Sequence, residues 1–152
     1  MIVIERAVML NADAEQVFHA FVDPDERHEL MRDYVHRVEC DGSGLGSVYT
    51  MWVETGQGQA GVRELTVAFD SGRHSMEIEM IDTGGIVPFG NYRSRLDVQE
   101  AGKDGCVVVL QSSFVPVGID EADARVMAET NYAKVFDRLA ARFGSGKPGE
   151  LT

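Results

Sequence analysis

One stretch in the second half of the chain decides the fold. It reads Gly84-Gly85-Ile86-Val87-Pro88-Phe89-Gly90-Asn91-Tyr92-Arg93-Ser94 and leads into a strand predicted over residues 91–99. A second strand is predicted over residues 107–114 and ends in Gln111-Ser112-Ser113-Phe114. An acidic turn, in which Asp120 or Asp123 can act as N-cap, then opens a long amphipathic helix that Gly144 ends. This order predicts a sheet against which the last helix packs.

The residues before this stretch predict the rest of the sheet. Alternation favours an opening strand over residues 2–10, and Asn11 is a suitable N-cap for a helix that stops at Asp23. Pro24 suits the first turn of a second short helix over residues 24–31. Further strands are expected over residues 34–40, 47–53, 62–69 and 74–81. Short connections imply antiparallel pairing, so the predicted class is α+β, with about seven strands.

Length and composition are those of one globular domain. The 152 residues are 44% hydrophobic, and no apolar run reaches the roughly 20 residues of a membrane span. We expect one domain over residues 1–144 and a flexible tail over residues 145–152, where Gly, Ser and Pro follow one another. The first residues lack the features of a signal peptide, which predicts a cytoplasmic protein.

Charge and motifs exclude several classes of partner and chemistry. A formal net charge of −11 disfavours nucleic acid and anionic membrane surfaces as partners. Cys40 and Cys106 form no CxxC pair and have no histidine at ligand spacing, so no metal site is predicted. The chain contains no P-loop, dinucleotide fingerprint or Gly-x-Ser-x-Gly elbow. We therefore expect no metal and no cofactor.

The Gly84–Ser94 stretch, the two strands after it and the last helix resemble the START-like, helix-grip superfamily. This superfamily includes the birch-pollen allergen, the plant abscisic-acid receptors and the bacterial polyketide cyclase/dehydrase and lipid-transport group. The resemblance implies a curved sheet wrapped around the C-terminal helix, with two short helices after the first strand. A helix laid across a curved sheet cannot close on it everywhere, and the gap is suited to a small hydrophobic ligand. The protein is expected to be a monomer or a homodimer, without membrane insertion.

Aligned with the plant receptors, a set of positions in this chain is expected to face the ligand. These positions are Met51, Val53, Tyr92, Ser94, Gln111, Ser113, Met127, Asn131 and Val135. The three helix residues among them form an i, i+4 row, which helical periodicity supports independently. Tyr34 takes the place of a lysine that anchors an acidic ligand in the receptors, so that salt bridge is expected to be absent. Residues 55–59 and 87–89 lack the receptors' gate and latch sequences, so the chain does not resemble a hormone receptor in these loops.

The strand at residues 62–69 permits two registers. The family alignment points Glu64 into the cavity, whereas the apolar alternation of Leu65, Val67 and Phe69 points Arg63 there. A one-residue shift turns every side chain to the other face, so only one of the two can be inward unless a bulge intervenes. The alignment favours Glu64.

Polar groups in an apolar pocket suggest acid–base chemistry. His36, Tyr49, Glu64 or Arg63, Tyr92, Gln111 and Asn131 are the groups that could converge. His36 is the natural general base, although the pattern is more typical of a hydrogen-bonded inward histidine without a catalytic role. Tyr92 could donate to a carbonyl oxygen. The resemblance favours a cofactor-free cyclase or dehydratase of bacterial secondary metabolism acting on a polyketide-like molecule; a non-catalytic carrier or sensor, or a role through protein partners only, are the alternatives.

Overall fold

The computed structural model describes residues 1–145 of the chain. Its elements, in order, are β1 (Ile2–Leu10), α1 (Ala14–Val22), α2 (Pro24–Met31), β2 (Arg37–Asp41), β3 (Val48–Thr55), β4 (Gly58–Asp70), β5 (Ser75–Asp82), β6 (Phe89–Ala101), β7 (Gly105–Pro116) and α3 (Glu121–Phe143).

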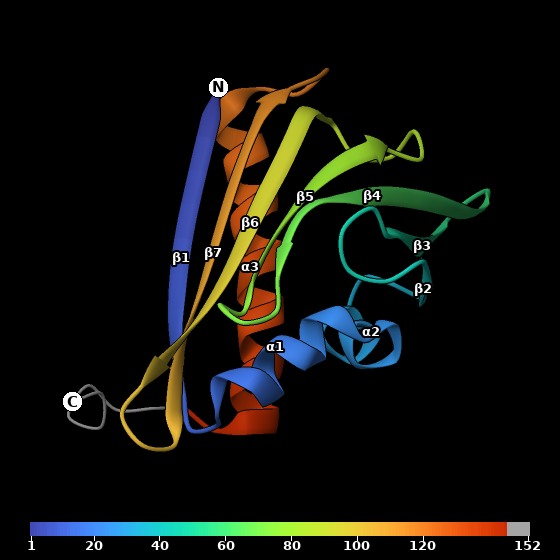
Figure 1. Cartoon of the computed structure of the whole chain (residues 1–152). Helices are drawn as coiled ribbons and strands as arrows, with labels where there is room; N and C mark the ends of the chain where they lie inside the picture. Colours follow the sequence, from blue (N-terminus) through green and yellow to red (C-terminus); the bar gives the residue numbers. More distant parts are fainter. Residues whose placement is uncertain (146–152) are drawn as a thin grey trace.

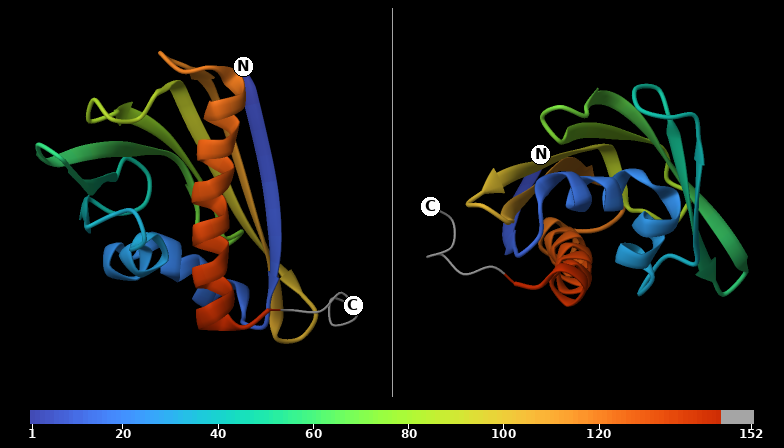
Figure 2. Two further views of the ribbon diagram at one scale, coloured as in Figure 1. Left: turned by 180° about the vertical axis from the view of Figure 1, so that it is seen from behind. Right: turned by 60° about the horizontal axis from the view of Figure 1, so that its bottom comes forward.

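The sheet has seven strands in the order β1-β7-β6-β5-β4-β3-β2, and every neighbouring pair is antiparallel. It curves strongly, and α3 lies along its concave side, while α1 and α2 cross one end (Figures 1 and 2). This architecture confirms the predicted α+β helix-grip fold. Within residues 1–145, no helix combines the length and the apolar character needed to cross a membrane.

The long helix packs through one apolar face. Its buried residues are Ala124, Ala128, Tyr132, Val135, Leu139 and Phe143, spaced three or four positions apart. This spacing places them on one side of a helix with 3.6 residues per turn. The polar residues between them are exposed or half-buried, so α3 is amphipathic and its apolar face shares a core with the sheet.

Aspartates cap all three helices. Asp13, Asp23 and Asp120 each accept a hydrogen bond from a backbone N–H in the first turn. The prediction of Asn11 as the first N-cap was therefore wrong by two residues. Asn11 instead joins the two ends of the fold, because its N–H donates to the Gly144 carbonyl and its Nδ2 to the Ser145 carbonyl.

The first residue of the predicted tail, Ser145, is part of the described structure. Ser145 forms a bridge with Leu10, which ties it to the end of β1. The remaining part of the predicted tail, residues 146–152, lies outside the described residues.

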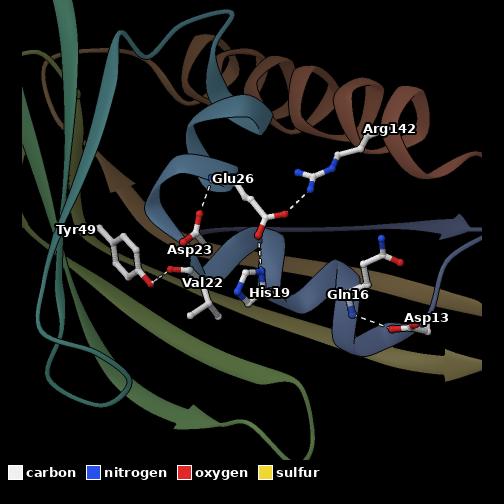
Figure 3. Close-up of polar contacts among 8 residues, drawn as sticks. All are labelled: Asp13, Gln16, His19, Val22, Asp23, Glu26, Tyr49 and Arg142. Carbon is white, nitrogen blue, oxygen red and sulfur yellow. Dashed lines mark hydrogen bonds and ion pairs between the residues drawn. The ribbon is translucent and has the colours of Figure 1, made fainter.

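Ion pairs hold α2 between its neighbours. The Glu26 carboxylate contacts both His19 on α1 and Arg142 on α3 (Figure 3). Beyond the end of α2, Asp33 accepts a hydrogen bond of 2.9 Å from Arg138 Nε on α3. These contacts fix the position of α2, whose inner residues form one wall of the cavity described next.

Candidate ligand cavity

A cavity of about 380 Å³ lies between the concave face of the sheet, α3 and α2. The loop before β6 contributes Ile86 and Val87 to its lining. Most of the wall is apolar and includes Phe21, Met51, Val62, Met76, Ile78, Leu96, Leu110 and Val135. A volume of this size, lined mainly by apolar side chains, is typical of a site for a small organic molecule.

Nine of the residues singled out from the sequence line this cavity. They are Tyr34, Met51, Val53, Glu64, Tyr92, Ser94, Met127, Asn131 and Val135. The i, i+4 row on α3 therefore faces the space that helical periodicity indicated. What each residue does for a ligand remains a prediction.

His36 does not reach the cavity, contrary to the expectation of an inward-facing base. The chain turns after α2, where the N–H groups of Tyr34 and Val35 both donate to the Met31 carbonyl. Regular alternation begins only at Arg37, so Val35 is buried in the wall and His36 is exposed. The predicted strand started three residues too early, which placed His36 on the wrong face.

Gln111 and Ser113 also point away from the cavity. On β7 the buried positions are Cys106, Val108, Leu110, Ser112 and Phe114, while Gln111 is exposed. The alignment was off by one residue, which turned the side chains to the opposite face. Apolar alternation could not correct it, because Val107 and Val109 on the outer face are as apolar as Val108 and Leu110. Ser112 is the inward polar residue that sequence reasoning missed.

A β-bulge reconciles the two registers of β4. Glu64 is 6% exposed and lines the cavity, whereas the neighbouring Arg63 is exposed on the outer face. The pairing with β5 shifts between Thr66 and Ala68, so the residues before and after this point follow different alternations. Val62, Glu64 and Thr66 are buried before the shift, and the Leu65–Val67–Phe69 pattern does not extend back to Arg63.

Arg27 is the second functional candidate that the sequence did not reveal. It is 5% exposed and lines the cavity from α2, with Nη1 at 4.0 Å from Glu64 Oε1. The helix sequence Pro-Asp-Glu-Arg-His-Glu-Leu-Met is mostly charged, so nothing in it marks Arg27 as inward. A positive charge therefore lines the cavity from α2, although Tyr34 stands where the plant receptors have their lysine.

The guanidinium of Arg27 is held in a fixed orientation. Its Nε donates to the Phe21 carbonyl at 2.8 Å, and its Cζ lies 3.7 Å from the centre of the Tyr49 ring. Tyr49 was predicted to line the cavity, but it does not. Its ring lies against Arg27, and its hydroxyl donates to the Val22 carbonyl (Figure 3). Tyr49 thus positions Arg27 and is not itself available to a ligand.

Burial dominates the electrostatics of Glu64. Loss of water raises the pKa of its carboxyl from 4.5 to about 7, and the nearby positive charge of Arg27 offsets part of that rise. Burial also raises the pKa of Tyr34 and Tyr92 above the ordinary value of 10.0 and that of Tyr132 to about 12. At neutral pH the tyrosines are therefore neutral hydroxyls, while Glu64 exists in both protonation states.

Three hydroxyl groups, from β6, β7 and α3, form a cluster at the cavity wall. The Tyr92 hydroxyl is 3.0 Å from Ser112 Oγ, which also contacts the Tyr132 hydroxyl. Three hydroxyl hydrogens serve two hydrogen bonds within this cluster, so one hydrogen is left over. Since Tyr92 and Tyr132 both line the cavity, that hydrogen can be donated to a ligand oxygen.

The described part of the chain offers no site for a metal ion. Among residues 1–145, no group of three or more His, Cys, Asp and Glu side chains is placed to hold one. Cys40 and Cys106 are free thiols. The polar residues that line the cavity are Arg27, Tyr34, Glu64, Tyr92, Ser94, Asn131 and Tyr132.

The titration of Glu64 predicts an unusual pH dependence of stability. Because the folded-state pKa is raised, the folded protein keeps a proton that the unfolded chain has lost between pH 4.5 and about 7, and stability falls as pH rises through this window. Glu64→Gln removes this loss. We compare the free energy of unfolding of the variant with that of the wild type at each pH. This difference should be roughly 2–3 kcal/mol more favourable to the variant at pH 8 than at pH 5.

Urea unfolding of both proteins at the two pH values measures this difference. Glu54→Gln is the matched control, because Glu54 is exposed at the end of β3 and outside the cavity lining. Equal pH dependence of the wild type and Glu64→Gln would show that Glu64 is solvated and titrates as an ordinary carboxyl.

Comparison with known proteins gives the same fold. The family model described as polyketide cyclase / dehydrase and lipid transport matches residues 1–144. Comparison with curated protein sequences found no significant match.

Solved structures similar to this one include both enzymes and proteins named without an activity. The protein XoxI from Bacillus cereus has a TM-score of 0.79 at 17% identity, with 94% of this chain and 96% of that chain covered. Zhui aromatase/cyclase from a Streptomyces species has a TM-score of 0.74 at 16% identity, with 93% and 92% covered. Norcoclaurine synthase from Thalictrum flavum has a TM-score of 0.66 at 18% identity, with 91% of each chain covered. At these identities the likeness concerns the fold, and the family match over nearly the whole chain supplies the assignment: this protein belongs to the polyketide cyclase/dehydrase and lipid transport family.

Proposed function

We propose that this protein binds a small hydrophobic molecule in the cavity and acts on it as a cofactor-free cyclase or dehydratase, with a polyketide-like or related compound as substrate. One observation carries the proposal: a carboxyl group, Glu64, is buried in the wall of an apolar cavity and has its pKa raised by burial to about 7. Such a group can accept or donate a proton near neutral pH, as a general acid or base must.

The other polar groups have complementary roles in this proposal. Glu64 as carboxylate removes a proton next to a carbonyl group, and the resulting enolate oxygen accepts a hydrogen bond from Arg27 or from the hydroxyl cluster. The apolar walls bind the body of the substrate and exclude water from the reacting atoms. An aromatase/cyclase among the proteins of similar fold supports the choice of chemistry. His36 has no part in this proposal, because it is outside the cavity.

Binding in the cavity is tested by filling it. Ser94 on β6 lines the cavity, whereas Ser113 on the neighbouring strand β7 does not, so the same substitution can be made inside and outside. Ser94→Phe is expected to weaken binding of naphthalene-based probes at least about 10-fold, which is about 1.4 kcal/mol. Ser113→Phe should leave binding unchanged.

Native mass spectrometry and calorimetry provide the measurements. A compound that copurifies with the wild type and Ser113→Phe, but not with Ser94→Phe, identifies the natural ligand. If both variants bind the probes as the wild type does, the cavity is not the binding site.

A further inference from the structure

One buried donor in the cavity wall has no partner. Arg27 Nη1 makes no hydrogen bond to any atom of residues 1–145, although the side chain is almost completely buried. An arginine is always charged, and buried polar groups are almost always hydrogen-bonded in folded proteins. Since Arg27 lines the cavity, the natural place for the missing acceptor is a bound molecule.

Glu64 does not fill this role. Its Oε1 is 4.0 Å from Arg27 Nη1, which is beyond the 2.7–3.2 Å of a hydrogen bond. The guanidinium cannot rotate towards it freely, because Nε is bonded to the Phe21 carbonyl and the plane lies over the Tyr49 ring. Tyr49 is fixed in turn by its bond to the Val22 carbonyl. The free Nη1 is therefore a rigid, preorganised donor.

We propose that the ligand is an amphipathic molecule whose carboxylate accepts a hydrogen bond from Arg27 Nη1, while its apolar body occupies the rest of the cavity. This inference rests on the proposed function in so far as the cavity must be a binding site. A carboxylate fits better than a neutral oxygen because charge-assisted hydrogen bonds to arginine are the strongest of their kind and can engage both oxygens. The spare hydroxyl hydrogen of the Tyr92–Ser112–Tyr132 cluster supplies a second donor for another oxygen of the same molecule.

Glu64 adjusts the charge of the site. When it is protonated, Arg27 lacks a counter-ion, and the ligand carboxylate supplies one. When Glu64 is ionised, it competes with the ligand carboxylate for the positive charge of Arg27. The other titratable groups near Glu64 are Tyr34 after α2, Tyr92 on β6 and Tyr132 on α3. The charge of Glu64 contributes to raising their pKa values, and all three stay neutral at physiological pH.

The test compares two probes that share one ring system. The probes are 2-naphthoate, which carries the carboxylate, and 2-naphthalenemethanol, which does not; decanoate and decanol form a second pair with a flexible body. Calorimetry is performed on the wild type, Arg27→Gln and Arg63→Gln. Arg63 is the matched control, because it precedes Glu64 on β4 but is exposed on the outer face.

We expect the wild type to bind each carboxylate about 10- to 100-fold more tightly than its alcohol, and Arg27→Gln to abolish that preference while binding the alcohols as before. Arg63→Gln should retain the preference. At pH 8, Glu64→Gln should strengthen naphthoate binding several-fold, since the competing charge is gone.

Each other outcome overturns the inference. If the wild type binds acid and alcohol equally, or Arg27→Gln weakens both equally, the carboxylate does not meet Arg27, while the cavity remains a binding site. If no member of either pair binds, the inference and the proposed function both fail. Circular dichroism reveals whether Arg27→Gln folds. If it does not, the preference for carboxylate over alcohol is compared between the wild type and Arg27→Lys, because lysine keeps the positive charge and lacks the forked guanidinium group.

Discussion

Glu64→Gln is expected to slow proton abstraction in the cavity by about 10²- to 10⁴-fold, the usual contribution of a positioned general base. The change replaces the carboxyl by a group of nearly the same shape that cannot take up a proton at neutral pH. Glu64 is the only carboxyl group among the described residues that line the cavity, so no neighbour can replace it.

The measurement uses 2-tetralone, a bicyclic ketone small enough for a cavity of about 380 Å³. Exchange of its α-protons for deuterium in D₂O is followed by proton NMR. The rate catalysed by the wild type should rise with pH through about 7 and then level off, because the carboxylate form of Glu64 is the base. Glu54→Gln, which makes the same change at an exposed position, should leave the rate unchanged.

The same experiment separates the enzyme from the carrier. If Glu64→Gln binds 2-tetralone and exchanges its protons as fast as the wild type, Glu64 is not a catalytic base. The protein would then be better described as a carrier or sensor, in which binding follows the size of the cavity and no ionisable group is essential.

Phe114→Ala is expected to lower the free energy of unfolding by about 3–5 kcal/mol, with a fall in Tm on the order of 10 °C. Phe114 is 0% exposed, and its ring centre is 4.1 Å from that of Phe89 and 5.8 Å from that of Tyr92. Truncation leaves a void on the buried face of the sheet beside Phe89 and Tyr92, and the paired backbones of β6 and β7 cannot move to fill it without breaking their register. It also removes the ring that supports Tyr92, and with it the position of the hydroxyl cluster.

Urea unfolding of Phe114→Ala and Ser113→Ala checks this prediction. Ser113 precedes Phe114 on β7 and points away from the cavity, so its change should be within about 0.5 kcal/mol of the wild type. A loss below about 1 kcal/mol for Phe114→Ala would mean that the aromatic cluster is loosely packed and does not organise the wall.

Local patterns in the sequence were sufficient for the architecture. Strands alternate with a period of two and helices with a period of 3.6, so β1, the two short helices and the apolar face of α3 could be placed from residue spacing alone. Met127, Asn131 and Val135 share one helix face for the same reason, and they line the cavity. Pro24 and Asp120 marked where α2 and α3 begin, because their effect on the backbone acts over only a few residues.

The composition of the polar site was decided by contacts between distant residues. Arg27 is buried through contacts with residues far from it or on another element, since its Nε donates to the Phe21 carbonyl and its guanidinium lies over the Tyr49 ring. Its charged neighbours in the sequence give no indication of this. Ser112 replaced Gln111 and Ser113 as the inward residue, because the pairing of β7 with β1 and β6 sets its register. The bulge between Thr66 and Ala68 let Glu64 face the cavity although the alternation after it pointed the other way. The sequence by itself determined the strands and helices, which form through short-range periodicity, and its resemblance to the START-like superfamily implied their helix-grip arrangement. Only the tertiary structure decided which charges meet in the cavity, since burial and strand register depend on the whole sheet.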